Sequence, residues 1–125
     1  MAQIRSLLVD DYNPLRQTVA KVLSCQNDFQ VVGEAEDGFE AIEKARALRP
    51  DLVLMDMSMP RCDGLEATRR IIQELPGATI ILFTSSPTDE RVTQALATGA
   101  YGCLDKTLGV KQMVQSLCKM LLPNG

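Results

Sequence analysis

Near the middle of the chain stands Leu52-Val53-Leu54-Met55-Asp56, an unbroken apolar run closed by a carboxylate. Two turn-forming residues, Pro50 and Asp51, precede it. A strand that is apolar at every position is typical of a parallel sheet whose two faces are both covered by helices. The run therefore predicts a buried parallel strand that ends in an acid.

Four other segments share the character of this run, being short, largely aliphatic or β-branched and bounded by turn residues. They are Ile4–Val9, Gln30–Ala35, Thr79–Phe83 and Gly102–Leu104. Five segments with helical spacing of apolar residues alternate with the strands. They are Pro14–Leu23, Phe39–Leu48, Leu65–Leu75, Asp89–Leu96 and Val110–Leu121, and we expect Asn13 to be the N-cap of the first.

Strand and helix thus alternate about five times, which favours right-handed crossovers and an open parallel sheet between two helix layers. We expect an α/β, doubly wound fold with a five-stranded parallel sheet and helices on both faces. No internal repeat or linker-like stretch divides the sequence, so residues 1–125 are expected to form a single domain. Sheets of this kind bind ligands outside the carboxyl ends of their strands.

The composition excludes several kinds of chemistry. The chain has 125 residues, of which 46% are hydrophobic and 23% charged, a balance typical of a globular domain. It contains no histidine, so a Ser-His-Asp triad, a Cys-His pair and a histidine-ligated zinc are all excluded. Its four cysteines form no C-x-x-C pair and are expected to be free thiols. Chemistry here must depend on carboxylates, hydroxyls and lysine.

Charge and hydropathy indicate the cellular location of the chain and the kinds of partner it binds. The apolar stretches are far shorter than the roughly 18 residues that a membrane span requires, and the N-terminus does not read as a signal peptide. A net charge of -3 argues against binding of nucleic acid or anionic lipid by this domain. We therefore expect a cytoplasmic protein with protein or small-molecule partners and no membrane contact.

Polar residues follow four of the five expected strands. They are Asp10-Asp11, Asp56, Thr84-Ser85 and Asp105-Lys106. Two carboxylates about 4 Å apart repel by roughly 4 kcal/mol at an effective dielectric constant near 20, so three acids together favour a bound cation. Oxygen ligands without His or Cys select a hard ion, and Mg²⁺ suits a site that also admits phosphate and water.

At these residues the sequence resembles the receiver (CheY-like) domain of bacterial two-component response regulators, over essentially its whole length. The segments that carry the resemblance are Leu7–Asp11, Val32–Ala35 with Asp37-Gly38, Arg49–Asp56, Met59–Thr68 and Gly99–Gly102. Around Val31–Ala35 and Leu65–Ile71 it is most similar to receivers that precede a LuxR-type helix-turn-helix output domain. The resemblance implies a flavodoxin-like (βα)5 fold with strand order 2-1-3-4-5.

The resemblance also implies a role for each site residue. Asp56 is similar to the phosphoacceptor, and Asp10 and Asp11 to the acidic pair that binds Mg²⁺ together with Asp56 and the backbone carbonyl of Ser58. Thr84 is similar to the hydroxyl that bonds the phosphoryl group, and Lys106 to the cation that pairs with a phosphoryl oxygen. A carboxylate can accept a phosphoryl group covalently, given positioning and countercharge.

A phosphorelay switch is the function this resemblance implies. A sensor histidine kinase or phosphotransfer protein would donate the phosphoryl group, and the surface of the fourth helix, fifth strand and fifth helix would change. That change would control an output domain, a partner protein or a homodimer. The chain would not be a conventional enzyme, although it would catalyse its own phosphorylation and dephosphorylation.

Two residues depart from the family pattern. Cys103 stands three residues before the lysine, where receivers usually have an aromatic residue, so aromatic gating is not expected, and we interpret Cys103 as a small strand residue. Thr107 replaces a common proline after Lys106, and a trans peptide is expected there because a cis bond without proline costs about 2.5–4 kcal/mol.

Three other functions remain open from sequence. A flavodoxin-like cofactor binder would need a first loop that cradles phosphate, whereas Asp10-Asp11 would repel it. A dedicated Mg²⁺-dependent phosphohydrolase would need a D-x-D motif after the first strand, which is missing. A phosphorylation-independent receiver-like interaction module is the main alternative, and the retention of the acids, Thr84 and Lys106 argues against it.

Overall fold

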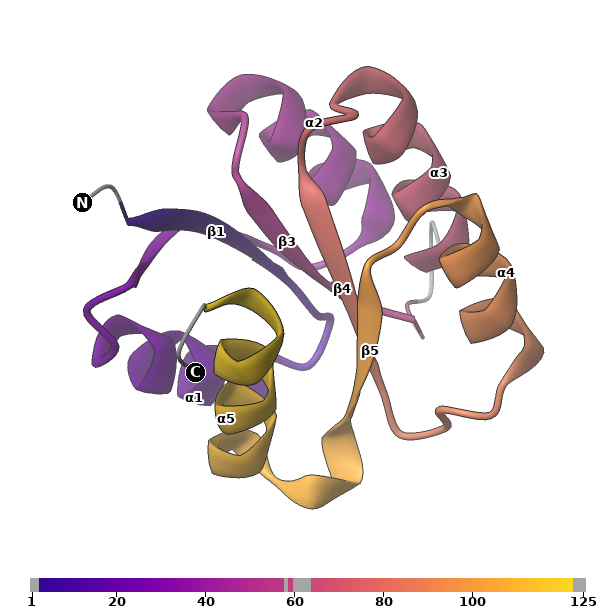
Figure 1. Ribbon diagram of the computed structural model, residues 1–125. Helices are drawn as coiled ribbons and strands as arrows, with labels where there is room; N and C mark the ends of the chain where they lie inside the picture. The colour runs from indigo at the N-terminus through magenta and orange to yellow at the C-terminus, as the bar shows by residue number, and fades with distance from the viewer. Residues whose placement is uncertain (1–2, 58, 60–63, 123–125) are drawn as a thin grey trace.

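Five parallel strands form one sheet in the order β2-β1-β3-β4-β5 within residues 3–57, 59 and 64–122, which the computed structural model describes (Figure 1). The strands are β1 (Ile4–Val9), β2 (Phe29–Ala35), β3 (Leu52–Asp56), β4 (Thr79–Thr84) and β5 (Gly102–Asp105). The helices are α1 (Asn13–Ser24), α2 (Gly38–Leu48), α3 (Gly64–Glu74), α4 (Glu90–Thr98) and α5 (Val110–Leu121), with a 3₁₀ turn η1 (Lys106–Leu108) before α5. The doubly wound fold and its expected strand order are confirmed.

The strands extend further than their apolar runs. Asp56, Thr84 and Asp105 are the last residues of β3, β4 and β5, so the polar groups at the edge of the sheet belong to the ladder itself. Strand pairing places Asp56 opposite Phe83 and Thr84 opposite Asp105. The backbone that carries these groups is therefore fixed by the sheet.

The expectation that Asn13 caps α1 is wrong. The helix begins at Asn13, and its N-cap is Tyr12, which makes no side-chain cap hydrogen bond. The Asn13 side-chain oxygen instead accepts from the Arg16 guanidinium at 2.5 Å and from Gln17 at 3.4 Å. An acceptor that faces forward along the helix toward later side chains cannot satisfy the free N–H groups of the first turn.

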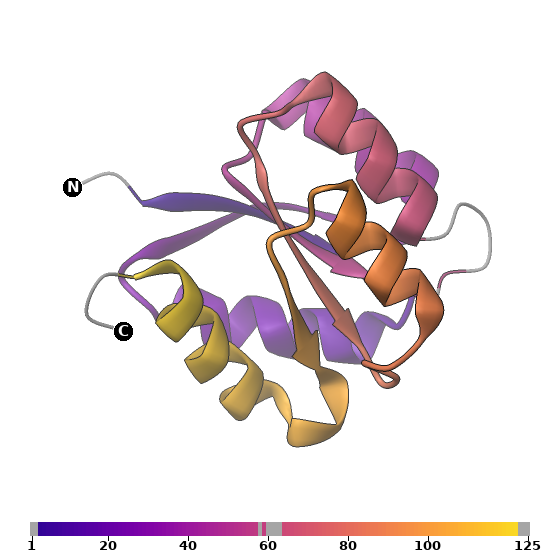
Figure 2. The same ribbon diagram turned by 45° about the vertical axis from the view of Figure 1, so that its right-hand side comes forward.

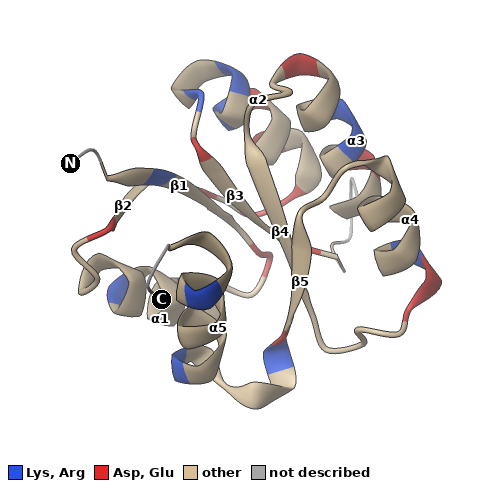
Figure 3. Ribbon diagram, in the orientation of Figure 1, with Lys and Arg blue, Asp and Glu red and all other residues tan. Residues whose placement is uncertain are grey.

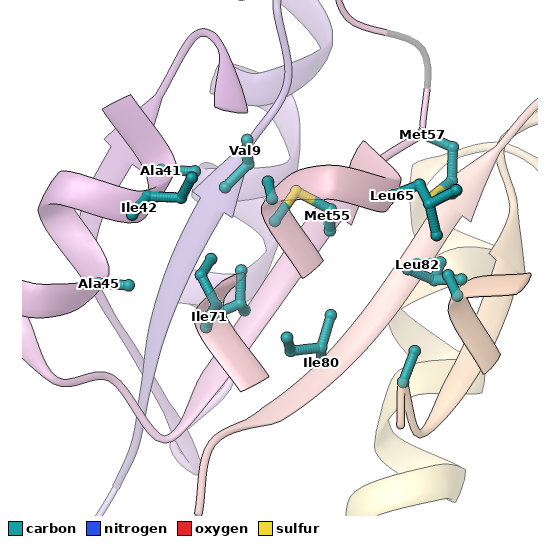
Figure 4. Packing of buried hydrophobic residues seen from close by; sticks show 14 of the residues in the cluster. Val9, Ala41, Ile42, Ala45, Met55, Met57, Leu65, Ile71, Ile80 and Leu82 are labelled. Atoms are coloured by element: carbon teal, nitrogen blue, oxygen red, sulfur yellow. The ribbon is translucent and has the colours of Figure 1, made fainter. Parts of the chain in front are cut away.

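Two helix layers cover the sheet, with α1 and α5 on one face and α2, α3 and α4 on the other (Figures 1 and 2). Each face has its own buried cluster. Between the sheet and α2, α3 and α4 lie Val9, Ala41, Ile42, Ala45, Met55, Met57, Leu65, Ile71, Ile80 and Leu82, among others (Figure 4). Toward α1 and α5 lie Leu8, Val19, Leu23, Phe29, Leu54, Ile81, Phe83, Leu104, Met113 and Leu117. No helix in the described ranges is long and apolar enough to cross a membrane.

Candidate functional site

Three carboxylates meet at the carboxyl edge of the sheet. Asp10, Asp11 and Asp56 each offer an oxygen, and these oxygens lie within 4.8 Å of one another. The arrangement follows from strand pairing, because β1 and β3 are neighbours and Val9 pairs with Met55 one residue before the acids. Asp10 and Asp56 are 0% and 1% exposed, whereas Asp11 faces solvent.

Because side chains alternate between the two faces of a strand, two of these acids lie on the same face of the sheet. Leu8 and Leu54 pack toward α1 and α5, so Asp10 and Asp56, two residues further on, lie on that same face. Leu104 packs on this face too, and Lys106, the first residue of η1, extends to Asp56 on the same face. Figure 3 shows the acidic end of β1 and the acidic-then-basic end of β5 on one side of the molecule.

Lys106 bridges the two buried acids. Its Nζ donates a hydrogen bond to Oδ1 of Asp56 at 3.0 Å and lies 3.5 Å from Oδ2 of Asp10. The ammonium thus contacts two of the three carboxylates in this group. Oδ2 of Asp10 is buried and has no hydrogen-bond donor in the described part of the chain.

The turn after β5 positions Lys106. Asp105 accepts hydrogen bonds from the Thr107 backbone N–H at 2.8 Å and the Thr107 hydroxyl at 2.6 Å, and these bonds lower the pKa of the Asp105 carboxyl. They begin η1 immediately at Lys106. The described residues contain no cis peptide bond, in keeping with the trans geometry expected at Thr107.

Thr84 ends the strand between Asp56 and Lys106. It is 4% exposed, and its hydroxyl oxygen accepts from the Ser86 backbone N–H at 3.0 Å. Phe83, the residue before it, pairs with Asp56 across the sheet. The structure therefore puts the hydroxyl on the strand beside the acid, but engages it with the following loop.

The first residue of α3 lies close to the end of β3. A Cβ added to Gly64, the first residue of α3, would lie 2.3 Å from the backbone oxygen of Asp56 and 2.8 Å from Cα of Met57. Only glycine allows the helix to begin this near the strand end. Ser58, expected to offer a backbone carbonyl to the metal, lies outside the described residues.

Arg16 is a site residue that sequence reasoning missed. It is 7% exposed and donates to the backbone oxygen of Asp10 at 2.7 Å and to Glu34 at 2.8 Å, besides its bond to Asn13. Its position was the available signal, because Arg16 lies three and seven residues before Val19 and Leu23 on the buried stripe of α1. An arginine on such a stripe needs acceptors, and one of those of Arg16 is the backbone oxygen of Asp10, a residue of the acidic cluster.

The donor set suits a hard divalent cation. Its side-chain ligands are all carboxylate oxygens, two are buried, and Oδ2 of Asp10 lacks a hydrogen-bond donor among the described residues. Burial of carboxylates is unfavourable unless a cation compensates for it, and Lys106 supplies one positive charge. Asp10, Asp11 and Asp56 therefore fit Mg²⁺ by chemistry.

Residues 6–118 match the family model described as "Response regulator receiver domain". The chain belongs to this family. Among its curated relatives are the response regulator GacA of Pseudomonas viridiflava, 40% identical over 91% of this chain and 53% of that protein, and VraR of Staphylococcus saprophyticus, 39% identical over 93% and 56%. The receiver thus spans about half the length of these relatives.

Solved structures agree with the family and with its subdivision. The signal receiver domain of the putative response regulator NarL from Mycobacterium tuberculosis superposes with a TM-score of 0.85 at 32% identity, covering 95% of this chain and 96% of that one. A LuxR-family response regulator from Aurantimonas sp. SI85-9A1 gives 0.87 at 32% identity, covering 96% and 86%. The expected similarity to receivers of the LuxR class is confirmed.

Cys103 is a partly buried residue of β5. It packs beside the cluster under α2, α3 and α4, and its thiol lies 3.7 Å from the Leu104 backbone oxygen. Burial, with a smaller contribution from Asp105, raises the pKa of the Cys103 thiol. A thiol that stays protonated is a weak nucleophile, which supports the interpretation as a small strand residue.

Proposed function

We propose that this receiver is a phosphorelay switch that accepts a phosphoryl group on Asp56 from a phosphohistidine of a sensor kinase or phosphotransfer protein. One observation carries the proposal: the buried Asp56 carboxylate hydrogen bonds to Lys106 at 3.0 Å and lies within a cluster that includes Asp10 and Asp11. Membership of the family supports the same assignment. We further propose that residues 1–125 form a single receiver domain that works in the cytoplasm.

The side chains can perform this transfer without a general base. A carboxylate oxygen of Asp56 forms the new O–P bond as the P–N bond of the phosphohistidine breaks, and the bonding pair of that bond stays with the imidazole nitrogen. A carboxylate nucleophile carries no proton to be removed, so the absence of histidine from the chain is no obstacle. Lys106, already hydrogen bonded to Asp56, is placed to pair with a phosphoryl oxygen.

Asp10, Asp11 and Asp56 would hold Mg²⁺, with the Ser58 backbone carbonyl as a further ligand. When bound, the ion supplies positive charge that offsets the charge on the phosphoryl oxygens. The three acids can serve this role because their oxygens already lie within 4.8 Å of one another. Arg16 holds the backbone of Asp10 in place through its carbonyl oxygen.

Thr84 would transmit the phosphorylated state. Its hydroxyl now accepts from the Ser86 N–H, and a phosphoryl group on the neighbouring strand offers strong acceptor oxygens to which the hydroxyl can donate. Movement of Thr84 would shift the segment from Ser85 through α4. The surface formed by α4, β5 and α5 would then bind an output domain, a partner protein or a second copy of the chain.

The phosphoryl group would also be removed at this site, by attack of water. The chain in this proposal is not a conventional enzyme, because Asp56 is both the acceptor and the group that is regenerated. Acceptance and hydrolysis together would set the lifetime of the active state.

Intact mass after incubation with acetyl phosphate tests the proposal. Wild type with Mg²⁺ should gain one phosphoryl group, and chelation of the metal or Asp56→Asn should abolish the gain. Asp51→Asn is the matched control, since Asp51 is an exposed aspartate just before the same strand and should leave the gain unchanged. If wild type accepts a phosphoryl group neither from acetyl phosphate nor from a phosphorylated histidine protein, the proposal fails and the phosphorylation-independent module replaces it.

A further inference from the structure

Lys106 has to reach across an entire strand to contact Asp56. Lys106 follows β5 and Asp56 ends β3, and β4 lies between these strands in the sheet. Neighbouring strands are about 4.8 Å apart, so the two backbones are separated by roughly 10 Å. The flexible lysine stem therefore passes over the end of β4.

Phe83 is the β4 residue that this stem crosses. Phe83 pairs with Asp56 in the ladder, and its backbone oxygen accepts from the Met57 N–H at 3.3 Å. Its ring packs in the cluster toward α1 and α5, on the face where Lys106 also lies, and is 2% exposed. The Lys106 ammonium nitrogen lies 4.9 Å from the centre of that ring.

We propose that Phe83 is the positioning residue for Lys106, holding the ammonium over its ring so that it faces Asp56; this inference rests on the proposed function of the site. The negative face of an aromatic ring attracts an ammonium, and the attraction grows as water is removed. The Lys106 side chain is 16% exposed. The two buried acids and the ring thus surround the ammonium group.

The ring restricts what the lysine would otherwise be free to do. A lysine side chain loses rotamer freedom when it is fixed, and solvent is open to Lys106 as an alternative. An aliphatic residue at position 83 would fill the core without attracting the ammonium. Phe83 therefore favours the arrangement in which Lys106 is ready for a phosphoryl oxygen, without touching that oxygen itself.

The matched control for this idea is Phe29. Phe29 is also 2% exposed and belongs to the same buried cluster, but it lies in β2, at the far edge of the sheet from Lys106. Phe29→Leu and Phe83→Leu remove the same ring from the same core. A difference between them at the site reports the contact with Lys106 and not the loss of packing.

The first readout is spectroscopic and does not depend on phosphorylation. A ring under the ammonium shields the Lys106 ε-methylene protons, so their NMR signal should lie upfield of the signals of the exposed Lys21 and Lys111. The upfield shift should vanish in Phe83→Leu and persist in Phe29→Leu. A Lys106 signal at the position of the exposed lysines in wild type would overturn the proposal, even if the protein is phosphorylated normally.

The second readout is binding of trifluoroberyllate, a phosphoryl mimic, in saturating Mg²⁺, measured by fluorine NMR. Phe83→Leu should weaken this binding about three- to tenfold, leave Mg²⁺ affinity within about twofold, and slow phosphorylation by acetyl phosphate by a similar factor, whereas Phe29→Leu should change none of them. Phe83→Met, a second non-aromatic variant, should behave like Phe83→Leu. Equal effects of the Phe29 and Phe83 substitutions would overturn the positioning role. A wild type that shows the upfield signal but binds no trifluoroberyllate would contradict the function proposed for the site.

Discussion

The two ends of the sheet differ in the burial and the hydrogen bonding of their charged side chains. At the amino end, the Arg5 guanidinium donates to the backbone oxygens of Arg49 and Leu48 at 2.8 Å each, which satisfies the carbonyls at the end of α2. Asp51 accepts from the Arg5 N–H at 2.9 Å and its own N–H donates back to the Arg5 carbonyl at 2.8 Å. These two charged side chains lie closer to solvent than the buried acids at the other end, and both hydrogen bond to the backbone.

At the carboxyl end, charge is buried and incompletely compensated. Asp10 and Asp56 are almost wholly buried, and Lys106 contacts both. Asp10 keeps one oxygen without a hydrogen-bond donor among the described residues. The comparison shows that similar residue types hydrogen bond to the backbone at one end and, at the other, form a buried acidic cluster that a bound cation would stabilise.

The two arginines give the largest expected effect. Arg16→Met should lower the free energy of unfolding by about 3 kcal/mol, because it removes a buried guanidinium, the charged partner of Glu34 and the donor to the Asp10 carbonyl. Arg5→Met, at the more exposed end, should lower it by only about 1 kcal/mol. Urea unfolding of both variants measures the difference. Equal losses would mean that burial does not distinguish the two ends.

Two cysteines, one partly buried and one exposed, should differ in the reactivity of their thiols. Burial raises the pKa of Cys103, so less thiolate is present at a given pH, and its access is restricted as well. Cys25, exposed at the end of α1, should react with iodoacetamide about tenfold faster near pH 8. Peptide mass mapping over time follows each thiol. Faster labelling of Cys103 would instead support a redox role for it.

Replacing Asp51, the exposed acid at the amino end, should destabilise the protein less than Arg16→Met does and should leave phosphorylation unchanged. Asp51→Asn should cost about 1 kcal/mol of unfolding free energy, because the backbone N–H of Arg5 loses a charged acceptor. Its rate of phosphorylation should equal that of wild type. A slowed rate would show that the two ends are coupled through β3 and do not have separate roles.

The ion pair between Arg46 of α2 and Glu74 of α3 should have the smallest effect on stability. The direction in which this effect changes with pH can be checked. The hydrogen bond from Arg46, with its charge, lowers the pKa of the exposed Glu74 below its usual 4.5. A lowered folded pKa contributes stability above the unfolded value, which is lost as the pH falls through the folded pKa. The small advantage of wild type over Glu74→Gln should therefore shrink as the pH falls below 4.5. An advantage that persists in acid would exclude the pair as its source.

The sequence predicted most of the fold because the strands and helices carry different apolar periods. The run Leu52–Met55 predicted β3 correctly, and the structure extends this strand to Asp56. The helix start at Asn13 was predicted wrongly, because the competing bond from Arg16 depends on how α1 lies against the rest of the site. In the sequence Phe83 looks like any core residue, because only the folded structure shows the Lys106 ammonium over its ring.

Unfolding of wild type and Asp10→Asn, with chelator and with Mg²⁺, tests the central claim most directly. Asparagine keeps the oxygen that accepts from the Tyr12 N–H but removes a buried charge that faces Asp11 and Asp56. With chelator the variant should be more stable than wild type by about 1–2 kcal/mol. Mg²⁺ at about ten times its Kd should stabilise wild type by about 1.4 kcal/mol and the variant little. A variant less stable than wild type with chelator, or a wild type that Mg²⁺ does not stabilise, would contradict the claim that the acids at the carboxyl end are only partly compensated and can hold a cation.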